Sequence, residues 1–189
     1  TETLQRIRSL ECQCDVYEIE WSPCGTMIAI GTGRTCELIV LNANDGEVLW
    51  RSHPFASASG MKTGTLGLHW NGDGHRIAVG NRIGEIAIVD IDLKTTEAIR
   101  KPKKEELLGD LKWHPDGNRL AVGLRFGERT ILDVRDHSVL QLSKLNLEVG
   151  EVIAWSPSGE FLATGEGQAI RIAAANAQTV CHLTGHLGV

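Results

Sequence analysis

Four tryptophans recur along the chain at intervals of 49, 43 and 42 residues, and each one opens the same short phrase. The phrases begin at Trp21, Trp70, Trp113 and Trp155 and read WSPCGTMIAIG, WNGDGHRIAVG, WHPDGNRLAVG and WSPSGEFLATG. Each holds a polar turn that ends in glycine, then an aliphatic residue, alanine, one further residue and glycine. The chain is therefore built from copies of one unit, and its fold must be worked out one repeat at a time.

Each repeat contains four short segments with the composition of β-strands. In the third repeat, residues 107–113 and 118–123 flank the tight turn 114–117, where proline presets φ and glycine accepts a positive φ. Third strands are predicted at 37–41, 85–90, 128–133 and 169–173, and fourth strands at 47–50, 97–100, 139–142 and 179–183. Four strands in a unit of about 40 to 45 residues are typical of a propeller blade. We expect an all-β propeller of four-stranded antiparallel blades, with about four blades in this chain.

The four tryptophans end the first strand of each repeat. The residues two positions earlier lie on the same face of that strand and are all aliphatic: Ile19, Leu68, Leu111 and Ile153. We therefore predict that Trp21, Trp70, Trp113 and Trp155 are structural core, buried where adjacent blades pack together.

The repeated phrase resembles the WD-repeat β-propeller family over essentially the whole chain, although the repeats are degenerate. Where that family has Trp-Asp at the end of the third strand, this chain has Leu-Asn, Val-Asp, Leu-Asp and Ala-Ala. The family's buried Asp–His–Ser/Thr–Trp network is thus expected to be absent from every complete repeat, which leaves more of the stability to apolar packing. The resemblance implies a non-catalytic protein–protein interaction scaffold, as a module of a larger protein or complex. The alternatives are a propeller enzyme with a site at the central channel and a purely structural spacer.

The chain is interpreted as a single propeller segment over residues 1–189, with repeats near 11–52, 65–100, 107–142 and 149–184. An additional outer strand is predicted at 3–10, and the Gly-His at 185–186 resembles the start of a further unit. We therefore expect the segment to be part of a larger propeller. The alternative is oligomerisation into a full ring, since incomplete ends allow self-association.

An arginine recurs in three of the four turns between second and third strands, at Arg34, Arg82 and Arg125. A rim of guanidinium groups suits an acidic or phosphorylated protein partner, because arginine binds carboxylates and phosphates through two hydrogen bonds. The alternative is that Arg82 pairs with Glu85, and Arg125 with Glu128, across the turn. The long connection 52–65 adds Phe55 and Met61 as candidate partner-binding residues, with a tolerated insertion as an equal alternative.

Composition excludes several other classes. The net charge of −5 argues against binding to nucleic-acid backbones or anionic membranes. Five irregularly spaced cysteines indicate free thiols in the cytoplasm or the nucleus. Because the cysteines lack the usual zinc spacing and no catalytic constellation emerges, we expect no metal site, no cofactor and no enzymatic activity.

Overall fold

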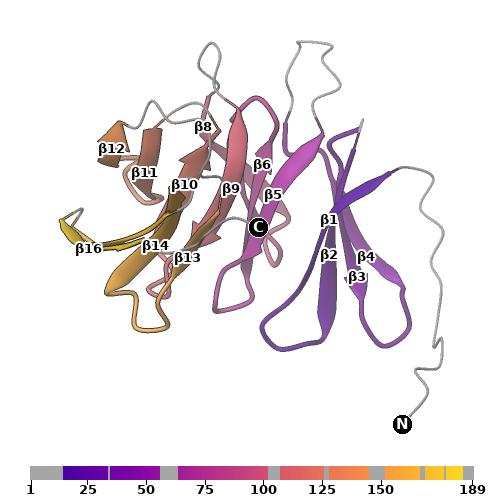
Figure 1. The fold of residues 1–189 in the computed structure, drawn as a ribbon. Coiled ribbons are helices and arrows are strands. Elements are labelled where there is room, and N and C mark those ends of the chain that lie inside the picture. Colours follow the sequence, from indigo (N-terminus) through magenta and orange to yellow (C-terminus); the bar gives the residue numbers. More distant parts are fainter. Residues whose placement is uncertain are drawn as a thin grey trace, which may run out of the picture.

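The computed structural model describes residues 15–33, 35–55, 64–101, 107–125, 128–144, 152–166, 169–176 and 178–184. These residues form sixteen strands in four separate sheets and include no helix (Figure 1). In particular, the described residues contain no helix long and apolar enough to cross a membrane. The additional strand predicted at 3–10 and the Gly-His at 185–186 lie outside the described residues.

Each sheet contains four strands that are consecutive in the sequence, paired antiparallel in chain order. We call these sheets blades 1 to 4. Blade 1 comprises β1 (Val16–Trp21), β2 (Met27–Thr32), β3 (Leu38–Asn42) and β4 (Val48–Ser52). Blade 2 comprises β5 (Thr65–Trp70), β6 (Arg76–Asn81), β7 (Ile86–Asp90) and β8 (Thr95–Arg100). Blade 3 comprises β9 (Leu108–Trp113), β10 (Arg119–Leu124), β11 (Glu128–Asp133) and β12 (Val139–Lys144). Blade 4 comprises β13 (Ile153–Trp155), β14 (Phe161–Glu166), β15 (Ala169–Ala174) and β16 (Thr179–Thr184).

The predicted fold class is confirmed. Every third and fourth strand expected from the repeats is present, with ends that differ by no more than two residues from the predicted ones. The repeated phrase also fixes the register, since each tryptophan pairs with the first aliphatic residue of the next strand: Ile28, Ile77, Leu120 and Leu162.

The blades form an open series. The first strands of consecutive blades contact one another, β1 with β5, β5 with β9 and β9 with β13 (Figure 1). No comparable contact joins β1 to β13 in the described part of the chain, so these four blades do not close into a ring.

The last glycine of the repeated phrase allows the next blade to come close. A Cβ added to Gly31 would lie 2.6 Å from the Thr65 side chain, and one added to Gly80 would overlap the Leu108 side chain. Since Thr65 and Leu108 begin the first strands of blades 2 and 3, a larger residue at either glycine would have to displace a side chain at the contact between neighbouring blades.

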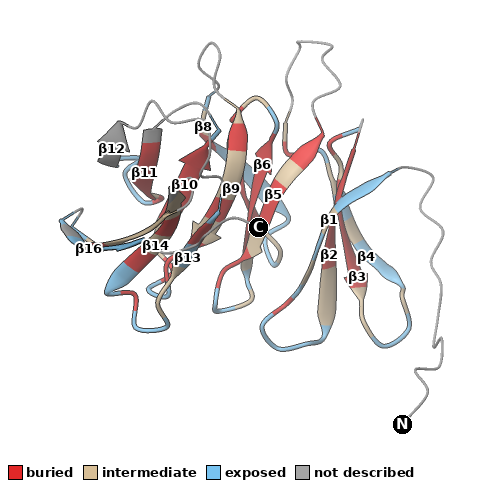
Figure 2. Ribbon diagram, in the orientation of Figure 1, coloured by how far each residue is buried: buried red, intermediate tan, exposed pale blue. Residues whose placement is uncertain are grey.

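The core lies between blades, with buried residues along strands such as β6 and β10 (Figure 2), and it corrects one prediction. Trp70 is 3% exposed and Trp113 4% exposed, each within an apolar cluster shared with the preceding blade. Trp155 is half-buried against such a cluster. Trp21, by contrast, is 57% exposed, so the prediction that all four tryptophans are buried is wrong for this one. The physical reason is that each of the other three packs against a preceding blade, whereas no described blade precedes blade 1.

Candidate functional site

Charged and polar side chains gather where the first strands of the blades converge. They belong to residues that precede the repeated tryptophan by one or three positions, and we call them the inner-strand polar row: Glu18, Glu20, His69, Asp110 and Lys112. Alternation along a strand turns them to the face opposite the tryptophan, toward the following blade. In the described residues this row is the one place where histidine, carboxylates and lysine from three blades interact with one another.

Three acceptors in the row each bind the main chain of the next blade. A Glu20 carboxylate oxygen accepts a hydrogen bond from the Trp70 N–H at 2.8 Å. Nδ1 of His69 accepts one from the Trp113 N–H at 3.1 Å, and an Asp110 oxygen accepts one from the Ile153 N–H at 3.2 Å. These amides lie on the free edge of a first strand, where no further strand of the sheet can pair with them. The row therefore satisfies buried donors and ties consecutive blades together.

Burial shifts the pKa values of two members in opposite directions. Desolvation raises the pKa of Glu20 to about 7, with the hydrogen bond from Trp70 opposing the shift. Desolvation also lowers the pKa of His69 to about 4, assisted by the positive charge of Lys112. The His69 ring is thus neutral at pH 7, and because Nδ1 accepts a hydrogen bond, Nε2 carries the proton. Nε2 lies 3.6 Å from the other Glu20 oxygen.

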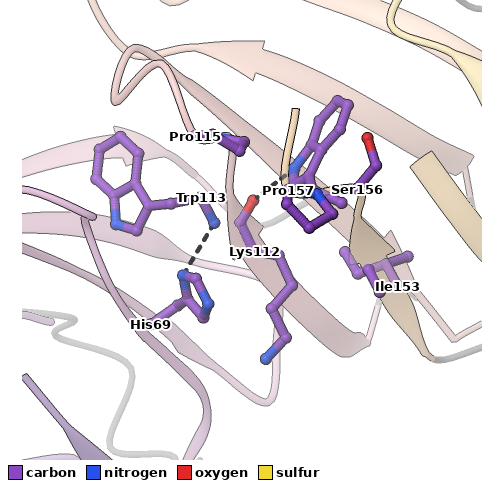
Figure 3. Close-up of a pocket in the computed structure, with 9 residues that line it drawn as sticks. His69, Lys112, Trp113, Pro115, Ile153, Ser156 and Pro157 are labelled. Atoms are coloured by element: carbon purple, nitrogen blue, oxygen red, sulfur yellow. Dashed lines mark hydrogen bonds between the residues drawn. The ribbon is translucent and has the colours of Figure 1, made fainter. Parts of the chain in front are cut away.

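Two pockets flank the row on the side of the turns that join the first and second strands of each blade. One, of about 450 Å³, is lined by residues of blades 1 to 3, among them Glu20, Trp21, His69 and Pro115. The other, of about 310 Å³, lies between blades 2, 3 and 4 (Figure 3). His69 forms part of both walls. In Figure 3 the dashed lines mark the bond from the Trp113 N–H to His69 and the bond from the Trp155 indole to the Lys112 carbonyl, at 3.2 Å.

A second set of contacts joins the blades at these turns. The Asn71 amide donates to the Gly117 carbonyl at 3.2 Å, and Nε2 of His114 lies 2.8 Å from the Gly159 carbonyl oxygen. Both side chains follow a repeated tryptophan directly, and both reach the turn glycine of the next blade. The His114 ring also meets Trp155 edge to face, with centroids 4.5 Å apart. Polar contacts therefore supplement apolar packing between blades, although the residues differ from those of the WD-repeat network.

The predicted partner-binding residues do not form one described cluster. Arg82 and Arg125 are exposed, and they share one rim because both turns bind the start of β9. There the Leu108 N–H donates to the Arg82 carbonyl, and the Arg125 N–H to the Leu107 carbonyl. Arg34 and Met61 lie outside the described residues. Phe55 is half-buried against the cluster of blades 1 and 2, so packing within the molecule accounts for this aromatic residue.

The alternative pairing across the arginine turns is wrong for Arg82. Among the described residues Glu85 accepts a hydrogen bond from the Asn81 amide at 2.5 Å and forms no ion pair with Arg82. The side chain of Glu128 is not described, so the pairing with Arg125 stays a prediction.

Cysteines and metal ligands add no further site within the described residues. Cys24, Cys36 and Cys181 form no disulfide with one another, and no group of three or more metal-ligating side chains occurs among the described residues. The Cys24 thiol is exposed, and hydrogen bonds with Ser22 and Thr26 lower its pKa to about 7.

The sequence analysis missed the inner-strand polar row. A signal was available, since Glu20, His69 and Lys112 hold the same place directly before the repeated tryptophan in three of the four repeats. Aligning the four repeats on tryptophan reveals the residues that recur. The position directly before the tryptophan holds a different residue in every blade, so it did not stand out.

Comparisons with known proteins support the fold and go no further. No protein-family model matches the chain, and no curated protein matches it either. Among solved structures, it resembles the β-propeller domain of Cps50 (Swd1) from Myceliophteria thermophila, with a TM-score of 0.75 and 13% sequence identity. The match covers 95% of this chain and 58% of that one. This chain is thus a β-propeller fold that spans little more than half the length of its structural neighbour.

Proposed function

We propose that this chain is a non-catalytic protein-interaction module, and that its four blades are part of a larger propeller. The observation that carries the proposal is the use of the inner-strand polar row. Glu20, His69 and Asp110 each hold a main-chain N–H of the following blade. The acceptor atoms of these side chains are therefore used to join blades. The open series of blades also suits a module that works as part of a larger assembly.

The geometry of His69 supports a non-catalytic role in particular. A general base needs a free lone pair within reach of a substrate proton. The single lone pair of the neutral ring lies on Nδ1, which already accepts the Trp113 N–H. Nε2 carries a proton and points toward Glu20. His69 therefore has no ring nitrogen left to act as a base.

We propose that the partner binds the rim that carries Arg34, Arg82 and Arg125. The exposed guanidinium groups of Arg82 and Arg125, at the edge of an acidic protein, would attract an acidic or phosphorylated segment by electrostatic complementarity. An array of acidic and phosphorylated peptides tests this with the Arg34/Arg82/Arg125→Ser variant, and we expect the variant to lose the binding of the wild-type chain. Arg135→Ser is the matched control, because Arg135 is exposed in the turn between β11 and β12, beside the turn between β9 and β10 on the opposite rim. Binding that survives the triple change, or falls equally with Arg135→Ser, contradicts the rim.

One observation favours a second candidate, an enzyme with its site at the inner strands. The pKa of Glu20, raised to about 7, lies in the range where a carboxyl group can serve as both acid and base. Hydrolysis of p-nitrophenyl acetate and p-nitrophenyl phosphate by the chain and by Glu20→Gln separates the candidates. Turnover that disappears in the variant would support the enzyme and overturn the interaction module.

A further inference from the structure

One side of blade 1 exposes apolar residues whose equivalents in the other blades pack against the preceding blade. Ile19 is 64% exposed and Trp21 57% exposed, and Ile28 beside them is only half-buried. We call these three residues the receiving face of blade 1. Their counterparts pack into apolar clusters with the preceding blade: Leu68, Trp70 and Ile77; Leu111, Trp113 and Leu120; Ile153, Trp155 and Leu162.

The three internal interfaces show what covers such a face. In each case the preceding blade contributes an alanine of its second strand and the aliphatic residue paired with it on the third strand. These pairs are Ala29 with Val40, Ala78 with Ile88, and Ala121 with Ile131. All six residues are buried, and each pair belongs to the cluster that holds the next blade's first strand. An alanine–aliphatic pair is thus the covering face of a blade.

Blade 4 has the same pair, and no apolar cluster of the described residues includes it. Ala163 pairs with Ile172 in the same register, and both are only half-buried. In the described part of the chain, blade 4 is the one blade whose covering pair is not buried. The chain therefore carries both halves of a further inter-blade interface, one at each end of the series of blades.

We propose that a second copy of this chain covers the receiving face of blade 1 with the Ala163–Ile172 pair of its blade 4. The proposal rests on the larger propeller of the preceding section and names the source of its other blades. Such a head-to-tail contact, made twice around a two-fold axis, closes a ring. Two copies of four blades make eight, which lies within the range of about four to eight blades seen in propellers. The contact would remove the exposed indole and the isoleucine beside it from water, a favourable change.

Light scattering coupled to size exclusion gives the mass that tests the proposal. We expect twice the chain mass of 20.6 kDa at micromolar concentration. Ile19→Glu places a charge on the receiving face and Ala163→Arg one on the covering face, and each variant alone should be a monomer. Leu93→Glu is the matched control, because Leu93 is 73% exposed in the turn between β7 and β8 and should leave the dimer unchanged.

Mixing the two variants tests whether the contact is head-to-tail. The Ile19→Glu copy keeps an intact covering face and the Ala163→Arg copy an intact receiving face, so the mixture should recover a dimer through one interface. A misfolded Ala163→Arg copy could not restore the dimer. A dimer in the mixture would therefore show that Ala163→Arg folds and that its monomeric state alone is due to the altered covering face.

Four results would overturn the proposal. They are a wild-type monomer at all concentrations, masses that grow beyond two copies, a dimer that both variants retain, and a dimer lost in Ile19→Glu but kept in Ala163→Arg. The last would indicate two receiving faces packed on each other. None of these results bears on peptide binding by the arginine rim, so the two proposals can fail separately.

Discussion

Trp21 and Trp113 hold the same place in two copies of one repeat, yet one is largely in water and the other is buried. Both end a first strand, and both pair with an aliphatic residue of the next strand. Trp113 has blade 2 in front of it, with Arg76 over its ring at 5.2 Å and His69 bound to its main-chain N–H. Trp21 has no such neighbour among the described residues. In a propeller, therefore, the strand makes a tryptophan available for burial, and the preceding blade buries it.

The largest expected effect tests this difference directly. Trp113→Ala should lower the free energy of unfolding by about 3 to 5 kcal/mol, because it removes a large buried side chain and leaves a cavity. Trp21→Ala should cost less than about 1 kcal/mol, since its indole already contacts water. Urea denaturation at the lowest practical protein concentration measures both, so that association does not contribute. Equal losses in the two variants would contradict the comparison.

A smaller effect is expected from the different acceptors that join the blades. Blade 1 holds blade 2 through Glu20, whose pKa rises from 4.5 to about 7 on burial. The folded state thus binds this proton more tightly than the unfolded chain, so the Glu20 contribution to stability falls as pH rises from 4.5 to 7. Glu20→Gln keeps an oxygen acceptor for the Trp70 N–H without this penalty.

The free energy of unfolding of Glu20→Gln should therefore rise relative to that of the wild-type chain as pH rises. At pH values above 7 the difference should reach roughly 1 to 3 kcal/mol. His69, whose pKa is lowered to about 4, contributes the opposite slope and is present in both proteins. Urea denaturation at several pH values between 4 and 8 gives the difference. A constant difference over that range would show that Glu20 ionises as it does in the unfolded chain.

The smallest effect concerns the turn glycines. Gly25 and Gly159 have φ values of 71° and 74°, so alanine is strained at both positions. A Cβ at Gly25 would meet nothing within 4 Å, whereas one at Gly159 would lie 2.5 Å from the His114 ring. Gly159→Ala should therefore cost about 1 to 2 kcal/mol more than Gly25→Ala, because it overpacks an inter-blade contact. Thermal unfolding compares the pair, and equal losses would remove His114 from the account of how blades 3 and 4 are joined.

The sequence predicted most of what happens inside a blade. Strand positions and register follow from the repeated phrase, since a tight turn such as 114–117 fixes which residues pair across it. Burial of Trp21 could not be predicted in this way, because it depends on a neighbouring blade and not on the local phrase.

The inner-strand polar row escaped prediction for a related reason. The bond from Trp70 to Glu20 joins residues 50 positions apart on strands of different sheets. Only the close approach of β1 and β5 brings a carboxylate to that amide. The alternation of Glu20 and Trp21 indicates a polar face, but it gives no sign that the polar face binds main chain.

The order of contacts along the chain has a consequence for how the protein acquires its structure. Every sheet is made from consecutive strands, and each blade packs on the blade next to it in sequence. Loop closures are therefore short, and folding can start at any adjacent pair and extend toward both ends. During synthesis, blade 1 can complete its pairing before blade 2 has left the ribosome, and its exposed Trp21 is then a hydrophobic surface available to chaperones.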